Sequence, residues 1–170
     1  YPVMLYSHNK GGLGLSAYPL GELFASHGWV VISVEHDGDT LIDEVAFVAQ
    51  PLAINTITRL TDIEAVLTYL DEPPLNGRGL DFLRNAVDTS RIYLVGHGAG
   101  AMTALVLAGA PLNLATLQAS ACDGDPDARA CRFLERAAVQ SYLRRLPRVV
   151  VSGVTLQAPT PIDLVPPPGL

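Results

Sequence analysis

Four short apolar runs alternate with segments of helical spacing, and this alternation most constrains what the chain can fold into. The runs are rich in β-branched residues and lie at residues 3–6, 29–34, 91–95 and 149–156. Between them, apolar residues recur three or four positions apart, as they do on one face of a helix. Strands that alternate with helices form parallel sheets with helices on both faces. We therefore expect an α/β fold with a doubly wound, mostly parallel sheet.

The helical segments have recognisable boundaries. Residues 17–27 are expected to form a helix that Gly28 ends, and residues 113–145 are expected to be mostly helical. Asn55 is predicted to cap the N-terminus of a long helix, which ends before Pro73. The buried face of this long helix is predicted to hold Ile57, Leu60, Ile63, Leu67 and Leu70.

Composition and charge exclude several kinds of partner. The formal net charge is −6, only 16% of the residues are charged, and lysine and arginine do not cluster, so nucleic acid and anionic membrane surfaces are not expected as partners. No apolar run approaches the roughly 18 residues that span a bilayer. We expect no cofactor. Because the chain begins directly in a strand pattern without methionine, we interpret residues 1–170 as one incomplete domain, whose missing C-terminal half or self-association covers the sheet edge near Val149.

Two cysteines, Cys122 and Cys131, flank a short polar segment. One interpretation is a pair of unrelated free thiols. The other is a disulfide that closes a small loop, which implies an oxidising compartment such as the periplasm or the extracellular space. A metal site is not expected here, because no histidine lies close by in the sequence.

The segment from Gly96 to Gly100, with the sequence GHGAG, joins the third apolar run to a helix that is expected to end near Gly109. A glycine-rich turn before a helix can bind phosphate, but Thr103 breaks the G-x-G-x-x-G spacing of dinucleotide sites. The same strand–turn–helix context holds the nucleophile elbow G-x-S-x-G of α/β-hydrolases. Here the central position is Gly98 instead of serine.

Three segments resemble bacterial dienelactone-hydrolase-like proteins and the related platelet-activating-factor acetylhydrolases. Residues 2–12 are similar to the family's apolar strand followed by S-H-G, and residues 25–36 are similar to its SHG and V-x-V-E-H stretch. The third segment is the elbow, together with residues 88–92 before it, and residues 122–132 resemble an insertion of some bacterial members. The resemblance spans nearly the whole chain. It implies an α/β-hydrolase fold and the hydrolysis of lipid-like, lactone or small carboxylic esters.

The resemblance also implies roles for individual residues. Gly98 occupies the nucleophile position, and the backbone amides of Lys10 and Ala99 match the donors of the oxyanion hole, which stabilises the charge of a tetrahedral intermediate. The position of the triad acid falls at Gln157, with Asp163 as a nearby alternative. In this fold the histidine base follows the acid along the chain, yet none of the four histidines follows Gly98.

Four residues are expected to line the ligand cleft: His8, Asn9, His36 and His97. Of these, His8 is expected to shape the oxyanion loop, His36 to form local hydrogen bonds and His97 to pack beside the elbow. Arg59 and Asp62 are expected to form a surface or packing pair, because they lie three apart on a helix. Asp37 and Asp39 are interpreted as turn residues.

Two functions follow from these observations. In the first, the chain belongs to an ester-hydrolase lineage and is inactive as it stands, because it lacks the nucleophile and the base. In the second, it is a non-catalytic pseudoenzyme or binding module, which holds a small carboxylate or ester in the remnant oxyanion cleft.

Overall fold

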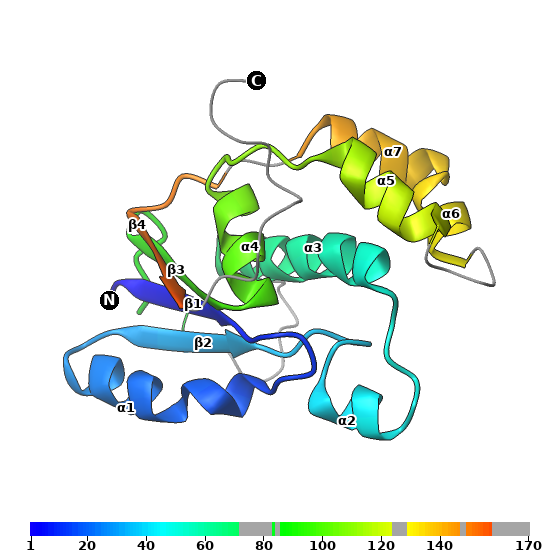
Figure 1. The fold of residues 1–170 in the computed structure, drawn as a ribbon. Helices are drawn as coiled ribbons and strands as arrows, with labels where there is room; N and C mark the ends of the chain where they lie inside the picture. The colour runs from blue at the N-terminus through cyan, green and yellow to red at the C-terminus, as the bar shows by residue number, and fades with distance from the viewer. Residues whose placement is uncertain (72–82, 84–85, 124–128, 147–148, 158–170) are drawn as a thin grey trace.

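A parallel sheet lies at the centre of the computed structural model, which describes residues 1–71, 83, 86–123, 129–146 and 149–157. Within these residues, four strands pair in the order β2-β1-β3-β4, and every pairing is parallel (Figure 1). The strands are β1 (Val3–Ser7), β2 (Val30–Val34), β3 (Ile92–His97) and β4 (Gly153–Gln157). The predicted α/β class with a parallel sheet is confirmed.

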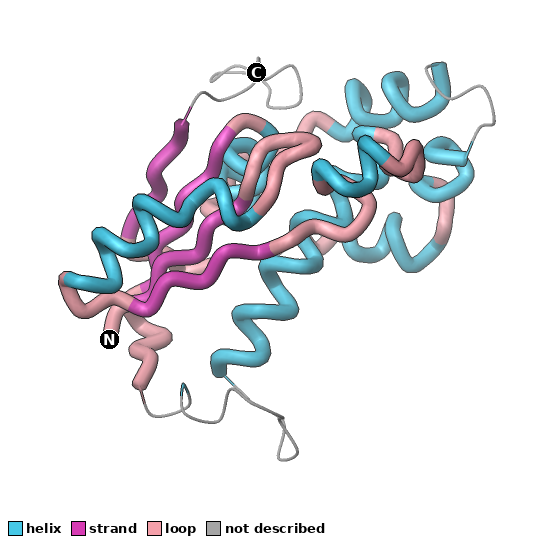
Figure 2. Tube along the Cα trace, turned by 90° about the horizontal axis from the view of Figure 1, so that it is seen from below, coloured by secondary structure: helices cyan, strands magenta, loops and turns pink. Residues whose placement is uncertain are grey.

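Helices cover both faces of this sheet (Figures 1 and 2). Helix α1 (Tyr18–Ser26), which follows the short 3₁₀ helix η1 (Gly14–Ala17), lies on one face. Helices α3 (Leu52–Asp71) and α4 (Ala99–Leu107) lie on the other. A short helix, α2 (Leu41–Val45), follows the loop after β2. Helices α5 (Leu114–Asp123), α6 (Arg129–Leu134) and α7 (Ala137–Arg144) form a separate group, which contacts α3 through α5 and α6.

Strand β1 is buried on both faces, which explains its continuous apolar run. Val3 and Leu5 belong to the larger core, between the sheet and α3 and α4. Met4 and Tyr6 belong to a smaller core, which also contains Ala17 and the partly buried rings of Phe24 and Trp29. Because successive strand residues point to opposite faces, one central strand can serve both cores.

The edge strands differ from the sequence prediction. The run at residues 29–34 predicts a fully buried strand, but β2 lies at the edge of the sheet and its first three residues are only partly buried. An apolar hollow of about 800 Å³ lies against it, lined in part by Ile32, Val66 and Leu70. The fourth strand begins at Gly153, four residues later than predicted. β-branched residues favour a strand wherever it lies, so they cannot distinguish an edge from a centre.

The helix boundaries bear out most predictions, with one correction. Helix α3 begins at Leu52, so Asn55 is not its N-cap. Asn55 is instead buried in the first turn, where its Nδ2 donates to the carbonyl of Gln50 at 3.1 Å and so ties the helix to the preceding loop. Gly28, with φ +80°, follows α1 as predicted. Of the predicted face of α3, Ile57, Leu60, Ile63 and Leu70 are buried and Leu67 is partly buried, whereas Pro73 lies outside the described residues.

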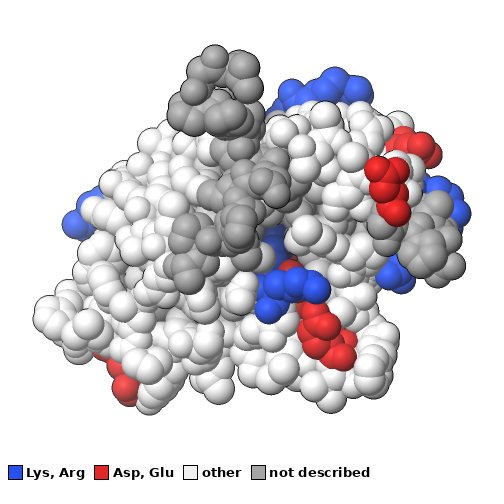
Figure 3. All heavy atoms as spheres, viewed as in Figure 1, with Lys and Arg blue, Asp and Glu red and all other residues white. Residues whose placement is uncertain are grey.

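The surface and the helix lengths bear on possible partners. Figure 3 shows lysine and arginine side chains at separate places on one face, with most of the visible surface uncharged. Among the residues that the structure describes, no helix is both long enough and apolar enough to cross a bilayer.

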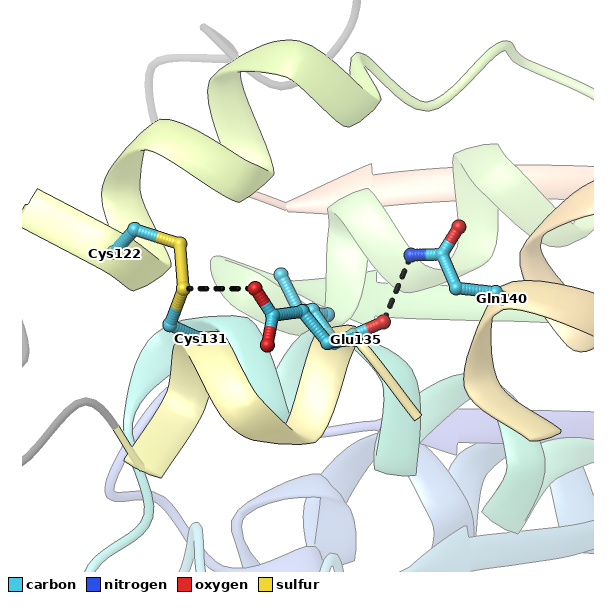
Figure 4. Close-up of a disulfide and its surroundings, with 5 residues drawn as sticks. Cys122, Cys131, Glu135 and Gln140 are labelled. Carbon is cyan, nitrogen blue, oxygen red and sulfur yellow. Dashed lines mark hydrogen bonds between the residues drawn. A yellow bond between two sulfur atoms is a disulfide. The ribbon is translucent and has the colours of Figure 1, made fainter. Parts of the chain in front are cut away.

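Cys122 of α5 and Cys131 of α6 are bonded to each other, with the sulfur atoms 2.09 Å apart (Figure 4). Glu135, just beyond the end of α6, places its Oε1 at 3.9 Å from Cys131 Sγ. A hydrogen bond connects α7 to the end of α6, because Gln140 Nε2 of α7 donates to the carbonyl of Leu134 at 2.8 Å. The disulfide and this hydrogen bond together link α5, α6 and α7 into one group.

Reducing the disulfide is expected to lower the free energy of unfolding by about 2–3 kcal/mol, because the loop of about ten residues that it closes gains freedom mainly in the unfolded chain. Urea unfolding of the native chain with and without reductant, beside the Cys122→Ser/Cys131→Ser double variant, measures this change. The reduced chain and the double variant should agree. Equal unfolding midpoints for the oxidised chain and the double variant would contradict the prediction.

Candidate active site

The carboxyl ends of the strands bring most of the predicted site residues to one edge of the sheet. Ser7, at the end of β1, is in register with Val34 of β2 and Gly96 of β3, and His97 is in register with Gln157 of β4. The loops that leave this edge of a parallel sheet are where ligands bind in α/β folds. Asp163 lies outside the described residues.

Gly98 forms the tight turn between β3 and α4. Its backbone has φ +56° and ψ −116°, a conformation that strains any residue with a Cβ atom. The Gly98 amide donates to the carbonyl of Gln157 at 3.0 Å, and the Gly98 carbonyl accepts from the amide of Ala101 at 3.0 Å. The turn is therefore held from the sheet on one side and from the helix on the other. Gln157 lies next to the elbow through its backbone, but its side chain is an exposed amide and not an acid.

The two flanking glycines allow α4 to approach the sheet closely. A Cβ atom at Gly100 would meet the backbone of Ser7 and would lie 2.8 Å from the carbonyl oxygen of His8. A Cβ atom at Gly96 would meet the backbone of Gly100 and would lie 2.5 Å from the amide nitrogen of Ala101. Because backbone atoms cannot rotate away, both positions require glycine at this spacing.

The amide of Ala99, which is the predicted oxyanion donor, already has an acceptor. It donates to Oδ1 of Asn9 at 3.2 Å. Asn9 stands where the S-H-G motif has glycine. Lys10 follows it with an exposed side chain, whose Nζ lies 3.4 Å from Oε1 of Glu44. The loop thus closes over the first amide of α4 instead of leaving it open to a ligand.

The side chain of Arg59 in α3 holds this loop in place. Its partner is Asp39 and not Asp62, which corrects the expected surface or packing pair with Asp62. The side chain of Arg59 is 1% exposed, and Nε donates to Oδ2 of Asp39 at 2.7 Å. The two terminal nitrogens donate to the carbonyls of His8 at 2.7 Å and Asn9 at 3.2 Å. Asp39 is buried as well, so it is not a simple turn residue, whereas Asp37 is exposed. The sequence held a signal for this burial, because Arg59 precedes Ile63 by four residues on the apolar face.

His36 was expected to form local hydrogen bonds, but it links β1 to α3 instead. Its Nδ1 donates to Oδ2 of Asp62 at 2.8 Å, and its Nε2 accepts from the hydroxyl of Ser7 at 2.8 Å. This order of serine, histidine and aspartate matches a catalytic triad. Ser7 is 2% exposed, however, and its Oγ also accepts from Arg59 at 3.1 Å. A substrate carbonyl cannot reach that oxygen, so the group braces the site and is not catalytic.

Burial lowers the pKa of both His8 and His36, so both rings are neutral near pH 7. The carbonyl of Asn9 accepts from Nδ1 of His8 at 2.7 Å, and Nε2 of His8 accepts from the amide of His36 at 3.3 Å. These partners assign the proton to Nδ1. A neutral His8 makes no ion pair with Glu35, although the carboxylate oxygen lies 3.6 Å from Nε2.

Among the residues that the structure describes, no side chain at the turn between β3 and α4 is placed to act as an activated nucleophile. Residue 98 has no side chain, and His8 and His36 are fully engaged in the buried network. His97 is half-buried, and its ring forms no hydrogen bond with the part of the chain that the structure describes. Nor do the described residues bring together three side chains that could hold a metal ion.

Comparison with known proteins finds similarity among solved structures. No family model matches the chain, and no curated protein matches it. Among solved structures, the chain is similar to a ferulic acid esterase from Streptomyces cinnamoneus, with 25% sequence identity and a TM-score of 0.44 over 62% of this chain. The match covers 32% of the esterase, so this chain spans about a third of that protein's length.

Proposed function

We propose that the chain belongs to the carboxylic-ester-hydrolase lineage of the α/β-hydrolases, close to the dienelactone-hydrolase-like and platelet-activating-factor-acetylhydrolase-like proteins, and that it does not hydrolyse esters. The observation that supports this most is the backbone of Gly98, with φ +56° and ψ −116° at the start of α4. This is the strained turn that lifts a nucleophile above the sheet in that fold. The 170 residues then form part of one such domain.

The expected loss of activity follows from the residues present. Removing the serine of a hydrolase triad lowers kcat on the order of 10⁶-fold, and the remaining oxyanion hole and binding contacts preserve only about 10³-fold over water. Here even the oxyanion contact is diminished, because Asn9 already accepts the Ala99 hydrogen bond. No histidine follows Gly98 to serve as a base.

The chain is expected to hydrolyse p-nitrophenyl acetate and butyrate no faster than buffer does. The Gly98→Ser variant should also remain at background, because its hydroxyl has no base. Extending the double variant Asn9→Gly/Gly98→Ser with the C-terminal half of an active relative, which supplies the histidine, should raise the rate, because a Cβ atom at residue 98 would overlap the side chain of Asn9. Turnover by the unmodified chain that persists in Gly98→Ala would place the chemistry elsewhere and overturn the proposal.

The alternative of a carboxylate-binding module has a specific requirement. A carboxylate that uses the Ala99 amide must displace Asn9 Oδ1, which is tethered to the same loop and so competes as an intramolecular ligand. We therefore expect no saturable shift of the Ala99 amide resonance with millimolar acetate or butyrate. A saturable shift would instead favour the binding module.

A further inference from the structure

The space above Gly98 is filled by the side chain of Asn9. A Cβ atom built on Gly98 would overlap Oδ1 and Cγ of Asn9 and would stand 3.1 Å from its Cβ. The same Oδ1 accepts the hydrogen bond of the Ala99 amide. The carboxamide of Asn9 therefore occupies the place that a side chain at residue 98 would take. It also accepts the hydrogen bond of the first backbone amide of α4.

Asn9 cannot withdraw from this position easily, because its backbone is held from three sides. Its carbonyl oxygen accepts from Nδ1 of His8 at 2.7 Å, from the Gly12 amide at 2.9 Å and from Arg59 at 3.2 Å. Rotation of the side chain would remove the overlap with Oδ1 and Cγ, but it would break the bond to Ala99. The Cβ atom of Asn9 would still lie 3.1 Å from a Cβ atom at residue 98, so one of the two backbones would have to shift by a few tenths of an ångström.

We infer that Asn9 and Gly98 are an exclusive pair, in which the pocket at the start of α4 admits the side chain of Asn9 or a side chain at residue 98, but not both. Asn9 is then the positioning residue that closes the oxyanion amide. The role of the Ala99 amide as an oxyanion donor rests on the proposed function, whereas the steric exclusion between residues 9 and 98 rests on the structure alone. It follows that Gly98→Ser by itself does not place a hydroxyl where a nucleophile belongs, and that residue 9 must change with it.

A double-mutant cycle on the full chain tests this pair. Gly98→Ser is made in the native background and in Asn9→Gly, and the folding equilibrium constant is measured by urea unfolding. The backbone strain at residue 98 and the chain entropy of glycine at residue 9 cancel in the cycle. We expect Gly98→Ser to reduce the folding constant about tenfold more beside Asn9 than beside glycine, within the range of contacting residues. Effects that are additive within about twofold would overturn the inference.

Two controls separate this overlap from a general effect of the loop. Asn9→Asp keeps the shape of the side chain, so the coupling should persist. Gly153→Ala introduces a Cβ at 3.0 Å from the ring of Tyr93 instead, away from the loop of Asn9, so its cost should be the same beside Asn9 as beside glycine. Coupling of equal size at residue 153 would contradict the assigned cause.

Should Gly98→Ser fail to fold, the exchange of the Ala99 amide in variants with an intact Gly98 provides the decisive measurement. Asn9→Gly and Asn9→Ala should speed exchange of that amide with solvent about tenfold or more, because the hydrogen bond is lost, while Asn9→Asp should leave it slow. Unchanged exchange in Asn9→Gly would overturn the inference. Ester turnover by the native chain would refute the proposed function without affecting this result.

Discussion

Replacing Arg59 by alanine is expected to lower the free energy of unfolding by about 3–5 kcal/mol, the usual penalty for removing one partner of a buried ion pair. The loss leaves the Asp39 carboxylate, itself 1% exposed, without its counter-ion. The carbonyls of His8 and Asn9 lose a donor in the same step. Urea or thermal unfolding followed by circular dichroism measures the change, and the variant is expected to be largely unfolded at elevated temperature.

Arg91 offers a matched control, because its Nε lies 2.6 Å from Oδ2 of Asp88 in an exposed pair. Water and salt screen such pairs, so Arg91→Ala should lose only a small fraction of what Arg59→Ala loses. Adding Asp39→Asn to Arg59→Ala should recover part of the stability, since it removes the buried unpaired charge. If Arg59→Ala and Arg91→Ala destabilise the chain equally, the buried network does not support the fold as described.

Acidification is expected to destabilise the chain as the pH falls below about 6.5. Burial holds the pKa of His8 and His36 below 6.5, so the folded chain keeps both rings neutral while the unfolded chain takes up protons. The stabilisation is therefore fully present above pH 6.5 and is lost as the pH falls toward the folded pKa values. Each histidine contributes a slope of up to about 1.4 kcal/mol per pH unit in that range.

The charges around the two rings oppose one another without changing this sign. Asp62 and Asp39 raise the pKa of His36 and Glu35 raises that of His8, but burial and the Arg59 cation lower both. Hydrogen bonds from Ser90 and Arg91 hold the pKa of Asp88 at about 2, so that group acts only in much stronger acid.

Variants of single histidines check the acid dependence. Unfolding free energies measured between pH 7.5 and pH 5 should show a shallower slope in His36→Gln, which removes one of the two groups. His27→Gln should keep the full slope, because His27 is exposed at the end of α1 and lies outside the network. A flat profile for the native chain would contradict the neutral buried state of both rings.

The strand–helix alternation and the glycine-rich turn are local features, and the sequence was sufficient to predict them. Periodicity along a few residues reports whether a segment is strand or helix, and spaced glycines report where backbones approach closely. For the same reason the tight turn could be placed at residues 96–100 and the buried face of α3 could be named. What such patterns do not record is the order of strands in space, so the edge position of β2 was missed.

The polar framework of the site depended on the tertiary structure alone. Arg59 pairs with Asp39, twenty positions away, and His36 joins Ser7 to Asp62, because α3 packs across the carboxyl ends of β1 and β2. Charged residues such as Arg59 and Asp39, taken singly, are more typical of a surface, and only a partner in the folded chain makes their burial possible. The dependence on tertiary structure also applies to Asn9 and Gly98, which are 89 positions apart in the sequence. Their side-chain positions coincide only because β1 lies beside β3.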